Sequence, residues 1–175
     1  VMNYLWDATG LGFASGTEAM NLDWGGWAAF VNGTDSKISG DVGLIRAPKG
    51  SGGKRTGWSG SHTYSITIAC SNKEASASLI WFLTNHEAQM HEGRTGKLPT
   101  MPRVWDDIAQ EMNDTGNVFM ADVFSTFKTS MAEDAVTPPL IPEWIAFSNI
   151  IYPELQKAIL GDKSIKEALD YAAKE

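Results

Sequence analysis

The sequence predicts an α/β fold in which helices dominate the second half of the chain. Three observations support this prediction. Short apolar runs lie between glycine-rich turns before residue 70. Residues 71–74 and 164–167 each place a serine three positions before a glutamate, which is the spacing of a helix capping box. From residue 73 onward, apolar residues recur every three or four positions, as on a helix with one buried face.

Short extended elements are expected in the first half of the chain. Three apolar or β-branched runs bounded by turn residues are predicted to be strands: residues 19–24, 41–47 and 63–69. Residues 27–31 are predicted to form one helical turn that ends at the turn dipeptide Asn32-Gly33. Residues 3–13 have no clear period and are interpreted as the tail of an element.

The second half is predicted to be helical apart from one proline-rich break. The expected helices cover residues 73–91, 102–112, 118–131, 143–160 and the residues that follow Ser164. Residues 138–142 must be extended, because each proline disfavours a helical conformation in the residue before it. Trp81 and Trp105 lie on helix faces and are expected in the core.

Composition limits the class of protein. A chain of 175 residues with 43% apolar content predicts one domain of average size. A net charge of −7 without a basic cluster disfavours nucleic acid and anionic membranes as partners. No apolar run approaches the roughly 18 residues of a membrane span. The single cysteine, Cys70, rules out an internal disulfide and is expected to be a buried thiol.

Two apparent motifs do not meet the requirements of their chemistry. His86 and His91 are five residues apart, so their side chains diverge around a helix instead of sharing a metal ion. The Gly-Gly-Lys sequence that ends at Lys54 lacks the other residues of a phosphate-binding loop. No carboxylate pair suggests a catalytic acid and base. We therefore predict no catalytic residue, no metal and no cofactor.

Tryptophans beside glycines are the most informative feature of the chain. Trp24, Trp27 and Trp58 are each expected where a strand passes into a glycine-bordered loop. Such rings offer flat apolar faces to a sugar, and the neighbouring Asp23 and His62 supply polar groups for its hydroxyls. Core packing is an equally good interpretation of each ring. Trp144, after the proline-rich segment, is intermediate.

The order of several segments resembles the C-terminal half of the extracellular solute-binding proteins of ABC importers, the group that includes maltose-binding protein. The matching sequences follow in chain order: Phe13-x-x-Gly16-x-x-Ala19-Met20, Gly43-Leu44-Ile45-x-x-Pro48, residues 57–68, Ser71-Asn72-Lys73-Glu74-Ala75, Phe82-Leu83-Thr84, Pro99, and Gly161-x-x-Ser164-x-x-Glu167-Ala168-Leu169. The resemblance covers nearly the whole chain.

This resemblance implies part of a two-lobed, type II periplasmic binding-protein fold with ligand in the cleft between the lobes. Residues 1–58 and 116–175 would belong to the second lobe, and residues 59–115 to a hinge crossing and the first lobe. The N-terminal half of the protein would be absent from this chain.

The resemblance also implies a binding role and its residues. Trp27 is the nearest match to the family's sugar-stacking tryptophan, with Trp24 as its rival. The aromatic pair that the family places on the helix after the proline-rich segment is replaced by Ser148 and Asn149, for which Trp144 could substitute. This difference favours a solute smaller or more polar than maltodextrin.

The implied function is therefore that of a sugar-binding, non-enzymatic importer component. It would act in the periplasm or outside the cell, with a lipid anchor in a single-membrane bacterium. Its partners would be a small solute, a membrane permease, and the missing half or a second copy of this chain. Two alternatives stay open: a glycoside-processing enzyme domain, and a binding protein for a polyamine or peptide, whose cation Asp23, Asp41 or Glu143 would face.

Overall fold

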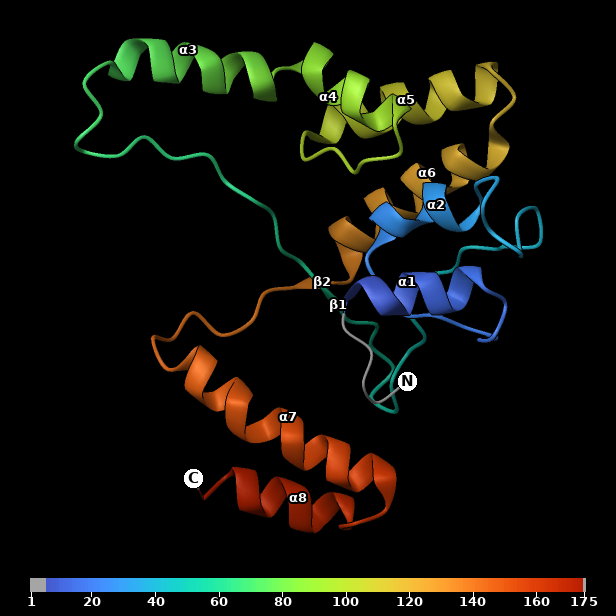
Figure 1. The fold of residues 1–175 in the computed structure, drawn as a ribbon, viewed down its shortest axis with the longest axis vertical. Coiled ribbons are helices and arrows are strands. Elements are labelled where there is room, and N and C mark those ends of the chain that lie inside the picture. Colours follow the sequence, from blue (N-terminus) through green and yellow to red (C-terminus); the bar gives the residue numbers. More distant parts are fainter. Residues whose placement is uncertain (1–5, 175) are drawn as a thin grey trace. The chain divides into compact units, whose positions relative to one another are not determined.

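The computed structural model describes residues 6–174, and Figure 1 shows its helices and one minimal sheet. Its elements follow in chain order: α1 (Trp6–Ala14), η1 (Gly25–Trp27), α2 (Ala28–Val31), β1 (Gly57–Trp58), α3 (Lys73–Thr84), α4 (His86–Arg94), α5 (Pro102–Asp114), α6 (Val118–Glu133), β2 (Ala135–Val136), α7 (Trp144–Leu160) and α8 (Ile165–Ala172). These elements form two compact units. One contains α1 to β2 and reaches Val136, and the other begins at Thr137 and contains α7 and α8. The division into lobes inferred from the resemblance stays a prediction.

The apolar core of the larger unit lies where α5 packs against α6 and α4. Val104 and Ile108 of α5 and Val123 and Phe124 of α6 are its largest fully buried side chains. Trp105 is also buried, and its ring meets that of Phe124 edge to face, with centroids 6.0 Å apart. The apolar periodicity predicted for both helices, and the core position of Trp105, are therefore confirmed.

The helix predicted over residues 73–91 is interrupted at Asn85. The backbone of Asn85 is extended, and its side chain accepts a hydrogen bond from the N–H of Ala88 at 2.9 Å, so α3 ends there and α4 begins. The cap of α3 is Asn72, which accepts from the N–H of Ala75 at 3.0 Å, rather than the expected Ser71. In both places an asparagine side chain satisfies one of the free N–H groups of a first helical turn.

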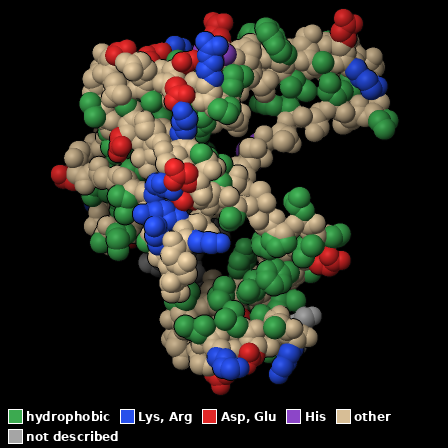
Figure 2. All heavy atoms as spheres, turned by 180° about the vertical axis from the view of Figure 1, so that it is seen from behind, with side chains coloured by type: hydrophobic (Ala, Val, Ile, Leu, Met, Phe, Trp, Pro, Cys, Tyr) green, Lys and Arg blue, Asp and Glu red, His purple; other side chains and the backbone are tan. Residues whose placement is uncertain are grey.

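The expectation that Trp81 lies in the core is wrong for this chain. None of the described residues of α3 is buried, and Trp81 is 69% exposed. Its apolar neighbours Leu79, Phe82 and Leu83 are also exposed. Figure 2 shows hydrophobic side chains gathered over α3, on the face of the molecule that it presents. The amphipathic pattern correctly predicted a helix but not a packing partner within residues 6–174.

None of the three predicted strands is paired in the structure. Residues 19–24 and 41–47 are irregular, and so are residues 63–69, although β1 lies just before the last of these. A strand is defined by hydrogen bonds to a neighbour, and apolar alternation alone cannot supply that neighbour. The ladder that is present is parallel and pairs Gly57 with Ala135 and Trp58 with Val136. It confirms an α/β fold that is rich in helix and has a small sheet.

The smaller unit is a pair of packed helices, α7 and α8. Helix α7 runs through Pro153 without interruption and ends at Gly161, whose φ of +84° is readily adopted only by glycine. Ser164 and Glu167 then form the predicted capping box of α8. Glu154 is buried, and its carboxylate accepts hydrogen bonds from Lys157 at 2.5 Å and from Lys163. These two bonds hold the pKa of Glu154 below its ordinary value.

Two further local predictions need correction. Residues 6–14, in which the sequence has no clear apolar period, form helix α1. Its two glycines and two alanines have small side chains that leave no apolar stripe. Cys70 is half-buried rather than buried, and its Sγ lies 3.2 Å from Oγ of Ser76. Within residues 6–174, no helix has both the length and the apolar character needed to cross a membrane.

Candidate functional site

In the tryptophan-rich segment, residues 24–27, the two glycines are packed tightly against aromatic rings. A Cβ atom added to Gly25 would lie 2.0 Å from ring atoms of Phe127 on α6. A Cβ atom on Gly26 would lie 2.2 Å from the ring of Trp24. Real Cβ atoms do not approach other heavy atoms so closely, so only glycine fits at either position without movement of a ring. The Gly-Gly pair therefore allows the Phe127 ring to pack against Gly25 and the Trp24 ring to pack against Gly26.

Asp23 fixes the start of this segment to α1. Its Oδ2 accepts a hydrogen bond from Oγ1 of Thr9 at 2.6 Å and a weaker one from Nδ2 of Asn21 at 3.5 Å. Its Oδ1 accepts the backbone N–H of Trp24 at 2.6 Å. Both carboxylate oxygens are therefore engaged within the chain. The Asp23 carboxylate thus links Thr9 of α1 to the backbone of Trp24.

The two rival tryptophans have different environments. Trp24 is 49% exposed and lies over Gly26. Trp27 is half-buried, and its ring packs so closely on α1 that a Cβ atom on Gly10 would lie 2.5 Å from its Cδ2. The ring of Trp27 also meets that of Phe30 edge to face, with centroids 5.6 Å apart. Trp24 thus presents the more accessible ring, and Trp27 contributes more to local packing.

Trp58 and His62 lie on the segment that leaves β1. Trp58 ends β1, is 79% exposed, and has Gly60 close to its indole nitrogen. His62 follows on an exposed, irregular stretch. The expected transition from strand to loop is therefore present at Trp58. The hydrogen bonds of the ladder fix the backbone beneath this ring, with the N–H of Ser59 donating to the carbonyl of Val136 at 2.8 Å.

Trp144 and Asn149 belong to the smaller unit, where both lie on α7. Trp144 begins the helix and is half-buried, whereas Asn149 is exposed. The ring of Trp144 lies beside that of Phe147, with centroids 5.6 Å apart and planes inclined by 35°. Ser148 is buried and donates from Oγ to the carbonyl of Trp144 at 2.8 Å. An aromatic pair is thus present on this helix, but one turn before the position that ungapped matching indicates.

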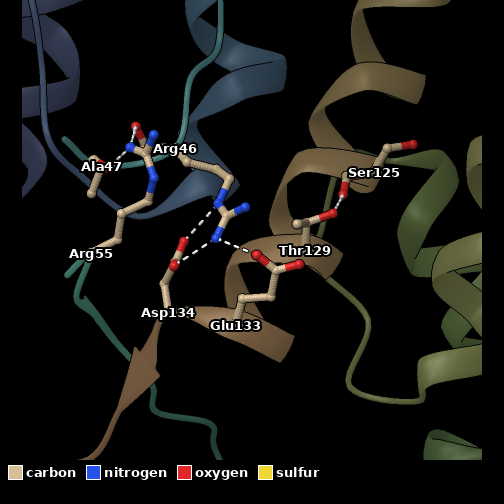
Figure 3. Close-up of polar contacts among 7 residues, drawn as sticks. All are labelled: Arg46, Ala47, Arg55, Ser125, Thr129, Glu133 and Asp134. Atoms are coloured by element: carbon tan, nitrogen blue, oxygen red, sulfur yellow. Dashed lines mark hydrogen bonds and ion pairs between the residues drawn. The ribbon is translucent and has the colours of Figure 1, made fainter. Parts of the chain in front are cut away.

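A cluster of charged side chains fixes the chain where α6 passes into β2 (Figure 3). The guanidinium of Arg46 donates two hydrogen bonds to Asp134, at 2.7 and 2.6 Å, and forms an ion pair with Glu133 at 2.7 Å. Asp134 is only 7% exposed, and Arg46 holds the pKa of its carboxyl below the ordinary value. Arg55 donates to the carbonyl of Ala47, which keeps the segment of Arg46 in place. The carbonyl of Asp134 in turn accepts the N–H of Gly57 at 2.9 Å, which ties the cluster to the sheet.

Two hollows on the larger unit lie away from the predicted ligand residues. One, of about 350 Å³, lies between α5 and α6, beside the ion pair of Asp106 and Lys128. The other, of about 290 Å³, lies among α2, the end of α4 and the start of α6. None of the seven predicted site residues lines either hollow. These two hollows are therefore not formed by the predicted ligand residues.

Comparison with known proteins identifies the fold. No protein-family model matches the chain. A solved structure described as maltose-bound MalE3 of T. maritima is similar, with a TM-score of 0.74 over 98% of this chain. The sequences are 24% identical over that match, which covers 42% of the MalE3 chain.

The chain has the fold of part of this binding protein. The expected resemblance to a partial two-lobed binding-protein fold is confirmed at the level of structure. The chain spans less than half the length of MalE3. The roles of individual residues in this chain are not tested by the similarity and stay predictions.

Sequence reasoning missed two residues that shape the tryptophan segment. Thr9 lies 14 positions before Asp23, and Phe127 lies about a hundred positions after Gly25. Phe127 also packs beside the core. The Gly-Gly pair was a usable signal, because adjacent glycines between tryptophans indicate close approach by another group.

Proposed function

We propose that this chain is part of the substrate-binding component of an ABC importer for a carbohydrate. One observation is the main support for this proposal. Trp24 presents a half-exposed ring held over Gly26, in a chain with the fold of a protein that has been solved with maltose. The proposal includes a membrane permease as partner and a periplasmic or extracellular location. A binding protein performs no chemistry, so no catalytic residue is assigned.

The physical basis of recognition is burial of a ring face. The C–H face of a pyranose is apolar, and an aromatic ring that covers it removes roughly 100 Å² of indole surface from water, which is worth about 2.5 kcal/mol. Trp58 and the pair formed by Trp144 and Phe147 offer further exposed or half-exposed rings. In a two-lobed protein a ligand that contacts both lobes only when they are closed shifts the population toward the closed form.

The exposed apolar face of α3 supports the inference that more of the fold belongs with this chain. Trp81, Phe82 and Leu79 are each more than half exposed, although apolar side chains spaced along a helix normally pack against a neighbour. The matched protein is more than twice as long as the matched region. We propose that the remaining part of the fold covers this face in the complete protein.

The proposal is tested by calorimetry on the full-length protein with maltose, other di- and monosaccharides, a polyamine and a short peptide. At least one sugar is expected to bind. Replacement of Trp24 by alanine is then expected to weaken binding by at least tenfold, or about 1.4 kcal/mol, because the ring face is lost. Trp24→Phe, which keeps a smaller flat ring, is the matched control and should lose less.

Two results would count against this function. Binding of the polyamine or the peptide without any sugar would favour the non-sugar binding protein, although the engagement of both Asp23 oxygens speaks against a free carboxylate at that position. Turnover of chromogenic glycosides that a single carboxylate substitution abolishes would favour the enzyme. Equal sugar affinity of the wild type and Trp24→Ala would show that Trp24 is not in the site.

A further inference from the structure

We propose that Asp23 and Thr9 are positioning residues that hold the Trp24 ring, and that Asp23 is not itself a contact for the ligand. This inference rests on the proposed function for its consequence, but its structural part can be measured without any ligand. It changes the role expected for Asp23, which as a polar neighbour of the tryptophans was predicted to bond sugar hydroxyls.

Both carboxylate oxygens of Asp23 already accept hydrogen bonds from within the chain. Its Oδ1 accepts the N–H of Trp24 at 2.6 Å, and its Oδ2 accepts the hydroxyl of Thr9 at the same distance. Hydrogen bonds to a carboxylate are stronger than those between neutral groups. The side chain of Asp23 is also half-buried, which increases the cost of exchanging either partner. Oδ2 also accepts the weaker bond from Asn21, so a sugar hydroxyl could bond this carboxylate without displacing a partner only at the remaining lone pair of Oδ1.

The same hydrogen bonds position the backbone that carries the Trp24 ring. The bond to Oδ1 fixes the backbone of Trp24, and the bond to Oδ2 connects that backbone to α1 through Thr9. The next two residues, Gly25 and Gly26, have no space for a side chain. The Phe127 ring fills the space beside Gly25, and the Trp24 ring fills the space beside Gly26. Trp27 then packs on α1 at Gly10. The residue that bears the exposed ring thus lies between attachments to α1 on both sides.

The consequence is that the ring is held in place before ligand arrives. A preformed binding group pays less conformational entropy on association than one that must be ordered. The Thr9 hydroxyl should therefore affect sugar affinity without touching the sugar. This predicts an effect of Thr9 that depends on its hydroxyl and not on its size.

The experiment uses the full-length protein labelled with 5-fluorotryptophan, with the Trp24 resonance assigned by its loss in Trp24→Phe. Thr9→Val removes the hydroxyl and keeps the shape of the side chain, whereas Thr9→Ser keeps the hydroxyl. We expect Thr9→Val to shift or broaden the Trp24 resonance and Thr9→Ser to leave it close to that of the wild type. An unchanged spectrum in Thr9→Val, or equal changes in both variants, would overturn the proposal.

The second readout is affinity for maltose, or for whichever sugar the calorimetric panel identifies. Thr9→Val is expected to weaken binding by about fivefold to tenfold, and Thr9→Ser to restore it. Asp23→Ala should then cost much less in the Thr9→Val background than in the wild type, because residues that act as one unit are not additive. Additive losses would make Asp23 an independent ligand contact and overturn the proposal.

The two proposals fail in distinguishable ways. A protein that binds none of the sugars contradicts the proposed function, and the fluorine spectra then decide the positioning role on their own. Alternatively, the protein binds sugar while Thr9→Val changes neither the Trp24 resonance nor the sugar affinity. That result leaves the proposed function intact and refutes the positioning role. Circular dichroism and thermal unfolding of each variant confirm that the chain is folded in the compared samples.

Discussion

Gly25 provides a sharp test of how the ring segment is packed. Its backbone lies in η1 and has no positive φ, so alanine fits the backbone at this position. The obstacle is the Phe127 ring, whose nearest atoms would lie 2.0 Å from the new Cβ, whereas carbon atoms in contact are normally about 3.5–4.0 Å apart. Either the ring or the segment must therefore move by more than an ångström.

The change in unfolding free energy caused by Gly25→Ala combines the cost of overpacking with a gain from the lower entropy of the unfolded chain. Insertion of a carbon into a filled site typically destabilises a protein by about 1–3 kcal/mol, and Phe127 packs against the core and cannot swing freely into solvent. Without that clash, glycine to alanine at a compatible backbone position stabilises by about 0.4–1 kcal/mol through the unfolded chain. We therefore expect Gly25→Ala to destabilise the wild type by about 2 kcal/mol.

The assay is urea unfolding of the full-length protein as a double-mutant cycle with Phe127→Ala. Phe127→Ala alone destabilises, but it removes the obstacle, so Gly25→Ala added to it should be neutral or slightly stabilising. Gly26→Ala is the matched control, because the group that it meets is the half-exposed ring of Trp24 and not a ring packed against the core. A Gly25→Ala cost that is the same with and without Phe127 would refute the packing argument.

Two further predictions concern charge and the apolar surface. Because Arg46 lowers the pKa of Asp134, the ion pair stabilises the folded state at pH values above the ordinary aspartate pKa of about 3.9, and this contribution disappears as the pH falls through the lowered value. The difference in unfolding free energy between the wild type and Arg46→Met should therefore shrink as the pH falls from about 3.9 toward the lowered pKa of Asp134. A difference that is constant with pH would contradict the assignment. The chain of 175 residues by itself should self-associate through the exposed apolar face of α3. The double substitution Trp81→Lys and Phe82→Gln should therefore reduce the binding of a hydrophobic dye and the average mass measured by light scattering. Leu140→Gln, at an exposed residue outside α3, is the control and should change neither quantity; equal effects of both changes would exclude a specific α3 surface.

The helices were largely predictable because their determinants are local. The periodic apolar residues of α5 and α6 and the Ser164 capping box act within a few residues of themselves, and the structure confirms them. The break at Asn85 was missed because asparagine is also tolerated within a helix, and its role as a cap depends on the extended backbone that it adopts here.

The strands and the site depend on distant residues, which a local pattern cannot identify. The apolar run at residues 19–24 lacks a ladder, whereas the two-residue β1 forms one because Ala135 lies beside Gly57. In the same way Thr9 and Phe127 act on the tryptophan segment only after the chain has folded. The sequence could indicate that Gly25 and Gly26 were approached closely, but not by which side chains.

The pairing of β1 with β2 also has a consequence for the order of folding. The two strands are parallel neighbours, yet α3, α4, α5 and α6 all lie between them in the chain, so the ladder closes a very long loop. Closing a long loop costs chain entropy, whereas the contacts of α5 with α6 join segments close in sequence. The helical core should therefore form before the ladder does. Substitutions at Ile108 would then mainly slow folding, and substitutions at Gly57 would mainly accelerate unfolding.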